Sequence, residues 1–188
     1  MKKYLNLLIA VGIVFGPTSC QEITCPEFNE EILTWIPYQE DDKIELYSQL
    51  KDSTIIVLIN SVVVTHTTSY NTGKDCGHCD DDIHISGSNF YVEIYLKDGK
   101  TRSQNIRLGD SHFSAYSESK KFLFDNKEYE VARTFDSSSG MFKKLIMAKD
   151  IGIIGLIDIH DNTWILKTDI KNRKSSEPRR ITINNRSC

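Results

Sequence analysis

The feature that most limits the possible folds is a long succession of short β-strand patterns separated by tight-turn signals. Residues 43–50 alternate apolar and polar side chains, 54–70 are rich in β-branched residues, and similar segments continue to residue 169. The turn signals between them include Asp98-Gly99, Asp125-Asn126 and Asp161-Asn162. These linkers are too short to contain crossover helices. The sequence therefore predicts a mainly β fold, a single antiparallel meander that forms a sandwich or a curled, barrel-like sheet.

Residues 25–38 differ from this pattern and predict one short N-terminal helix. Pro26 suits the first position of a helix, and several glutamates follow in the first turn, where the helix dipole favours them. Phe28, Ile32 and Trp35 would then share one face of the helix.

The N-terminus has the pattern of an export signal. A basic start, Met1-Lys2-Lys3, precedes an apolar stretch at 4–16, which is shorter than the roughly 20 residues of a membrane span. The small residues before Cys20 fit a lipoprotein signal, in which this cysteine is acylated; an ordinary cleaved secretory signal is the alternative. The expected organisation is a signal peptide at 1–19, a tether at 20–25, a β domain at 26–168 and a basic C-terminal tail at 169–188.

Several segments together resemble small exported lipoproteins of uncharacterised function that are common in Bacteroidetes. They are the Ser-Cys end of the signal, the pattern "C…F…WIPY" at 25–38, the strand "KIELYS" at 43–48, a cysteine-containing turn after the long strand, and "LIMAKDIGIIGLIDIHDNTWIL" at 145–166. The resemblance implies a location in the cell envelope and a β-rich fold. It implies no activity and no catalytic residues.

Charge and the residues after Cys20 bear on location and partners. The chain has a net charge of −3, and residues 169–188 alone carry six basic and two acidic residues, so the body of the protein is acidic and unsuited to nucleic acid. Gln21 rather than Asp follows Cys20, which favours the outer membrane. Two acyl chains, palmitate among them, would give stable attachment there. The expected partners are the membrane, through this anchor, and a protein or a small apolar ligand.

The tetrapeptide Cys76-Gly77-His78-Cys79 matches the active site of protein disulfide isomerases. A redox dithiol of that kind begins a helix, whose dipole lowers the thiol pKa. Here the pair runs into the acidic residues 80–82, which disfavour a thiolate, and 83–92 has the pattern of a strand. A redox site is therefore the less favoured interpretation.

Zinc is a second interpretation of the same cysteines. Cys76, Cys79 and His84 can be combined into a metal site, but one Cys-x-x-Cys pair supplies only half of the usual ligand set. The acidic run at 80–82 lacks the spacing of an EF-hand loop and is expected to be a solvated turn.

Disulfide bonds are the interpretation that we favour. If Cys20 is acylated, four cysteines remain, an even number suited to an oxidising compartment: Cys25, Cys76, Cys79 and Cys188. Four cysteines allow three pairings. We prefer Cys25 paired with Cys76 or Cys79, because that bond would attach the N-terminal segment to the 71–82 loop.

No complete catalytic motif is present. The sequence lacks Gly-x-Ser-x-Gly and His-Glu-x-x-His, and His112 and His160 are expected to be surface residues. We therefore expect an outer-membrane-anchored lipoprotein whose non-catalytic β domain binds a partner or small ligand without a cofactor. The alternative is a thiol-redox or metal-dependent envelope enzyme that uses the 76–79 loop, and a third hypothesis is a component of an envelope assembly.

Overall fold

The computed structural model describes residues 22–71, 78–167 and 181–184, and it confirms a mainly β protein. The strands are β1 (Glu22–Thr24), β2 (Lys43–Ser48), β3 (Ser53–Thr67), β4 (Ser69–Asn71), β5 (Asp80–Gly87), β6 (Phe90–Lys97), β7 (Lys100–Leu108), β8 (Ser111–Phe124), β9 (Lys127–Ser137), β10 (Phe142–Ala148), β11 (Gly152–Asp158), β12 (Thr163–Leu166) and β13 (Ile181–Asn184). A single 3₁₀ turn, η1 (Glu30–Thr34), accompanies them in these ranges.

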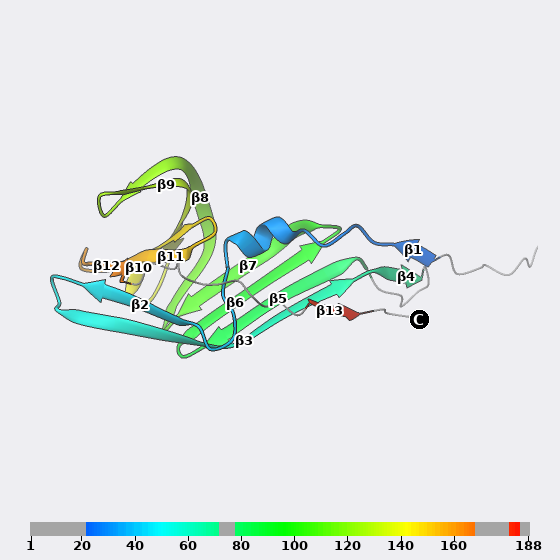
Figure 1. Cartoon of the computed structure of the whole chain (residues 1–188), viewed down its shortest axis with the longest axis horizontal. Coiled ribbons are helices and arrows are strands. Elements are labelled where there is room, and N and C mark those ends of the chain that lie inside the picture. The colour runs from blue at the N-terminus through cyan, green and yellow to red at the C-terminus, as the bar shows by residue number, and fades with distance from the viewer. Residues whose placement is uncertain (1–21, 72–77, 168–180, 185–188) are drawn as a thin grey trace, which may run out of the picture.

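Ten of these strands close into a barrel. Following the chain, β2, β3, β5, β6, β7, β8, β9, β10, β11 and β12 each pair with the next in antiparallel fashion. β12 then returns to β2, where Ile165 lies opposite Tyr47, and this contact closes the ring. Figure 1 shows the long strands β3, β5, β6 and β7 on one side, with β8 and β9 curling above the shorter strands. Of the two predicted architectures, the barrel is the one observed.

Strand β3 has two sets of neighbours. Its first half pairs with β2, and its second half pairs with β5, with a bulge between Ile59 and Ser61. Near its end β3 also pairs with β13, the one parallel contact among the described strands. β13 lies within the predicted basic tail, and β1, which pairs with β4, lies within the predicted tether.

The predicted hairpin turns have the backbone that their residues favour. Asp98 and Gly99 have φ values of 53° and 70°, and Asp125 and Asn126 have 49° and 58°. Two successive positive φ angles match the right-handed twist of the strands that a two-residue turn connects. The hairpins β6–β7 and β8–β9 predicted around these pairs are therefore confirmed.

Alternation along each strand builds the core. In β6, for example, Phe90, Val92, Ile94 and Leu96 are buried, while the residues between them are only partly buried. Because successive side chains of a strand point to opposite faces, a strand with this alternation contributes one row to the barrel interior.

The predicted N-terminal helix is wrong. Residues 25–38 form an extended segment with one 3₁₀ turn, and we call this segment the strap. In Figure 1 the 3₁₀ turn lies above the long strands, to the right of the curl of β8 and β9. Ile36 and Tyr38 are 1% and 0% exposed. They are buried in addition to Ile32 and Trp35, the residues that the predicted helix would have buried along one face. The shape of the strap follows from packing into the barrel, which overrides the helical pattern.

The far part of the β8–β9 hairpin covers a second, smaller apolar cluster. Phe122 and Phe124 of β8 pack on Ile146 of β10 and Ile154 of β11, next to the main core. Gly155 permits this approach, because a Cβ there would lie 2.3 Å from the Phe124 ring.

Candidate functional site

A disulfide joins Cys25 of the strap to Cys79, directly before β5. Their Cα atoms are 5.3 Å apart and 54 residues separate them in sequence. This is one of the two pairings that the sequence favoured. Cys20, Cys76 and Cys188 lie outside the described residues, so acylation of Cys20 and the state of the other two remain predictions.

This bond bears on the redox and zinc interpretations of the 76–79 loop. The Cys79 sulfur is bonded to Cys25, so it is neither a free thiolate nor half of a Cys76–Cys79 disulfide in this structure. Cys79 is buried, whereas His84 lies on the opposite face of β5 with its Nδ1 3.4 Å from the Tyr91 hydroxyl. The structure therefore does not bring Cys79 and His84 together. Within the described ranges, no three His, Cys, Asp or Glu side chains are arranged to hold a metal ion.

The acidic run is part of strand β5, which corrects the predicted acidic turn. Asp81 points inward, and its Oδ1 lies 2.8 Å from Nδ1 of His66. The flanking Asp80 accepts a hydrogen bond from the Tyr95 hydroxyl at 2.7 Å. This bond, together with burial and nearby carboxylates, raises the pKa of Tyr95 to about 12. The carboxylates of Asp80 and Asp81 are thus engaged by side chains of neighbouring strands.

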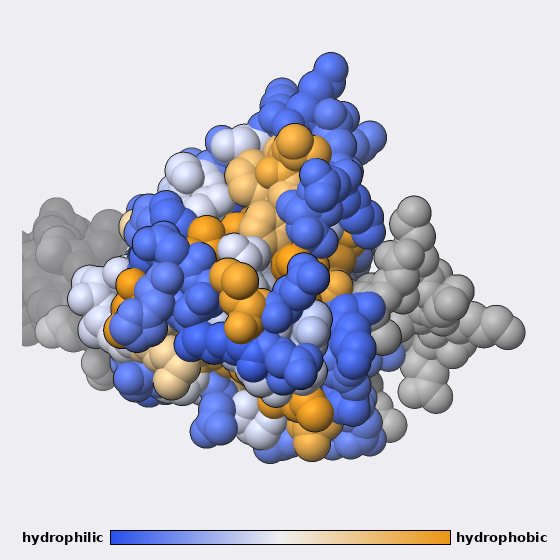
Figure 2. Space-filling model, turned by 90° about the vertical axis from the view of Figure 1, so that its left-hand side faces the viewer, coloured by the Kyte–Doolittle hydropathy of each residue, from blue (hydrophilic) through white to orange (hydrophobic). Residues whose placement is uncertain are grey.

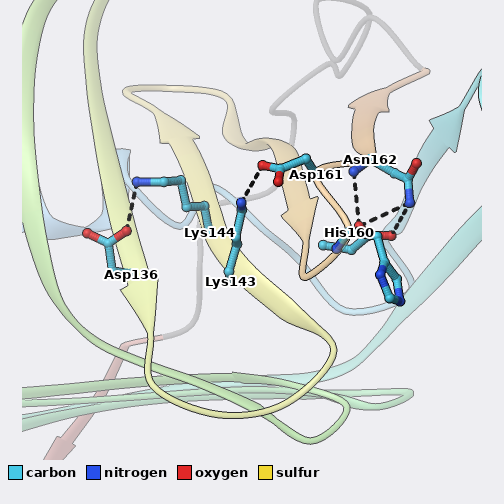
Figure 3. Close-up of polar contacts among 7 residues, drawn as sticks. Asp136, Lys143, Lys144, His160, Asp161 and Asn162 are labelled. Carbon is cyan, nitrogen blue, oxygen red and sulfur yellow. Dashed lines mark hydrogen bonds and ion pairs between the residues drawn. The ribbon is translucent and has the colours of Figure 1, made fainter.

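A second polar cluster holds the turn between β11 and β12 in place (Figure 3). The carboxylate of Asp158 is fully buried and accepts hydrogen bonds from the Asn162 side chain at 2.9 and 3.1 Å and from two backbone N–H groups. Lys51 Nζ lies 2.8 Å from it. Burial alone raises the pKa of Asp158, but the hydrogen bonds from Lys51, from Asn162 and from the backbone outweigh it and lower this pKa well below its ordinary value.

The neighbouring charges in Figure 3 are also paired. Lys144 contacts Asp136 at 2.8 Å, and Lys143 contacts Asp161. Asp161 points toward Lys143 while the His160 ring points away from it, as predicted for adjacent residues of a tight turn. Because the charges here neutralise one another and one carboxylate shapes the turn, we interpret this cluster as structural.

A row of polar side chains crosses the outer face of five strands. The pairing register places five residues side by side, one on each of β3, β5, β6, β7 and β8: Ser61, Ser86, Tyr91, Arg107 and His112. We call this set the polar row. Directly opposite residues of antiparallel strands point to the same face, and four strand spacings give the row a length of about 19 Å.

Arg107 is the unusual member of the polar row. Its guanidinium carbon lies 4.5 Å from the centre of the Tyr91 ring, a cation–π contact. Its Nε is buried and, among the described residues, has no hydrogen-bond acceptor. Arg133, by contrast, contacts the Glu118 carboxylate at 3.0 Å. A buried donor without an acceptor is rare in folded proteins and requires an explanation.

The two ends of the polar row differ: a hydrogen bond holds the side chains at one end, and the side chain at the other end is exposed. Ser61 and Ser86 bond to each other through their hydroxyls at 2.8 Å. His112, at the other end, is exposed directly beside Arg107. The sequence had marked His112 only as a surface residue and had not marked Arg107 or Tyr91, because their proximity depends on the register of three strands.

No protein-family model, curated protein or solved structure matches this chain. Within residues 22–71, 78–167 and 181–184, no helix is long and apolar enough to cross a bilayer.

Proposed function

We propose that this chain is an exported lipoprotein, anchored to the outer membrane by acyl chains on Cys20, whose β domain is a non-catalytic binding module. The signal pattern of residues 1–20 supports the anchor. The Cys25–Cys79 disulfide supports export, because such bonds persist in oxidising compartments.

The proposed anchor on Cys20 implies an orientation of the domain relative to the membrane. Cys25 is the fifth residue after Cys20, so the chain between them reaches at most about 18 Å. β1 and β4 lie at one end of the molecule and the β2–β3 hairpin at the other (Figure 1). The end that carries the disulfide therefore faces the membrane, and the β2–β3 hairpin points away from it.

We place the binding surface on the outside of the barrel. The strap side chains Trp35, Ile36 and Tyr38 are part of the main apolar core, so they take up interior space between the strands. Viewed from the β2–β3 end, the hydrophobic side chains form separate groups bordered by hydrophilic ones (Figure 2). The observation that carries the proposal is Arg107 in the polar row, a cation over the Tyr91 ring whose buried Nε has no acceptor among the described residues.

Intact mass of the membrane-extracted protein, with and without reduction, tests the anchor, and peptide mapping of the cysteines accompanies it. We expect acyl mass on Cys20, a Cys25–Cys79 cross-link and loss of membrane attachment in Cys20→Ser. An unmodified Cys20 would overturn the lipoprotein assignment. A Cys76–Cys79 dithiol that titrates and reduces a disulfide substrate would replace binding by redox catalysis.

A further inference from the structure

The polar row has the chemistry of a binding site for an oxyanion. We propose that Arg107, with His112 beside it, binds a carboxylate or phosphate group of the ligand that this domain recognises. This inference rests on the proposed binding function and names the chemical class of the ligand.

Arg107 is positioned for such a contact. A guanidinium presents its N–H donors in a planar fork that matches two oxygens of a carboxylate or phosphate. The cation–π contact with Tyr91 restrains the guanidinium, which reduces the side-chain entropy lost when a ligand binds. In the described ranges no carboxylate lies within 4.0 Å of Arg107, so the donors are not taken by an ion pair.

The surroundings extend the site on both sides. His112 lies directly opposite Arg107 on β8 and is exposed, so an incoming anion can contact both side chains. On the other side, His84 approaches the Tyr91 hydroxyl at 3.4 Å and can orient it. The hydroxyls of Ser61 and Ser86 continue the row and suit a ligand with further polar groups.

One acidic residue opposes anion binding and provides a test. Glu93 lies on the adjacent row, opposite Asn105 on β7 and His84 on β5, and diagonal to Arg107. It makes no ion pair with Arg107 within 4.0 Å. Because like charges repel, its carboxylate weakens the site, and its removal is expected to strengthen anion binding.

The experiment measures binding of inorganic phosphate and of acetate to the full mature chain in detergent, with chloride at equal ionic strength as the reference. We expect saturable binding of at least one of the two probes, with the Arg107 Nε–H NMR signal shifting in parallel. The stronger probe identifies the anion as phosphate or carboxylate. Absence of saturation with both probes, or equal binding of chloride, would overturn the inference.

Four variants locate the site. We expect Arg107→Gln to weaken binding at least tenfold, His112→Ala to weaken it about threefold, and Glu93→Gln to tighten it. Arg102→Gln removes an exposed arginine from the same strand and should leave binding within twofold of the wild type. Equal binding by Arg107→Gln and the wild type would sink the proposal. Thermal unfolding of each variant shows whether the fold is retained, and a confirmed anchor without anion binding would refute this inference alone.

Discussion

The hydroxyl of Tyr38 accepts a hydrogen bond from the backbone N–H of Ile153 at 2.6 Å. Tyr38 is the last aromatic residue of the strap and is 0% exposed, and Ile153 lies in β11, 115 residues further along the chain. This bond therefore joins the end of the strap to β11. The Tyr38 ring also meets the Phe90 ring edge-on at 6.0 Å.

We expect Tyr38→Phe to destabilise the protein by about 1–3 kcal/mol, because it leaves the buried Ile153 N–H without its acceptor. Urea unfolding measures this change in the free energy of unfolding. Tyr47→Phe is the matched control, since the Tyr47 hydroxyl bonds to exposed Asp52. Equal effects of the two substitutions would contradict the structural role given to Tyr38.

Gly152→Ala should be more damaging than Gly99→Ala. Both glycines have positive φ, 83° and 70°, so both substitutions carry a backbone cost of about 1 kcal/mol. A Cβ at position 152 would also lie 2.3 Å from the Tyr38 hydroxyl, whereas nothing lies within 4 Å of one at position 99. Thermal unfolding of the two variants compares them directly, and a larger loss in Gly99→Ala would refute the close packing at Tyr38.

Removal of the disulfide by Cys25→Ser with Cys79→Ser should lower the free energy of unfolding by about 4 kcal/mol, the loop-entropy value for a loop of this length. Unfolding curves with and without a reductant provide the measurement. The wild type should lose more stability on reduction than the double variant. If reduction leaves wild-type stability unchanged, the bond does not stabilise the strap.

Tyr95 should titrate late in the alkaline range. Its hydrogen bond to Asp80 is the largest cause of the rise of its pKa to about 12, followed by burial. A folded-state pKa above the unfolded value of about 10 means that the bond stabilises the fold below pH 10 and that this stability is lost as the pH rises through 12. Tyrosinate absorbance of the wild type minus that of Tyr95→Phe isolates the group. Asp80→Asn should move its titration toward pH 10, and an unmoved titration would contradict the assignment.

We expect the stabilising contribution of Asp158 to be lost at acidic pH. Its folded pKa lies below the ordinary value of about 4, so its contribution is present above pH 4 and is lost as the pH falls. We expect Asp158→Asn to cost about 1–3 kcal/mol at pH 7 and progressively less below pH 4. Chemical unfolding at several pH values measures the difference in the free energy of unfolding between the wild type and Asp158→Asn. If this difference grows as the pH falls, the predicted direction of the pH dependence is wrong.

The sequence was sufficient for the strands and several turns because these depend on local alternation and on residues such as Asp98 and Gly99 that accept positive φ. It was misleading for the strap. There the spacing of Phe28, Ile32 and Trp35 is helical, but burial against the barrel decides the conformation. Tertiary packing of this kind cannot be read from a local pattern.

The polar row could not be predicted from the sequence, because it depends on the register of the β6–β7 hairpin. Counting outward from the Asp98-Gly99 turn, a regular hairpin would place Tyr91 opposite the inward-facing Ile106. A bulge between Tyr95 and Leu96 shifts the register by one residue, so that Tyr91 lies opposite Arg107 instead. A shift of one residue moves a side chain to the other face of the sheet. The site therefore depends on a bulge that cannot be predicted from the sequence pattern.

Closure of the ring has a consequence for how the molecule folds. Leu46 in the first strand of the ring lies opposite Leu166 in the last, so this pairing joins opposite ends of the domain. Contacts of such long range form late, since the entropy of closing the loop must be overcome first. The nascent chain thus lacks its final edge contact until nearly all of it has been synthesised. Under the export that we propose, this delay favours a polypeptide that is still unfolded when it crosses a membrane, before the ring closes.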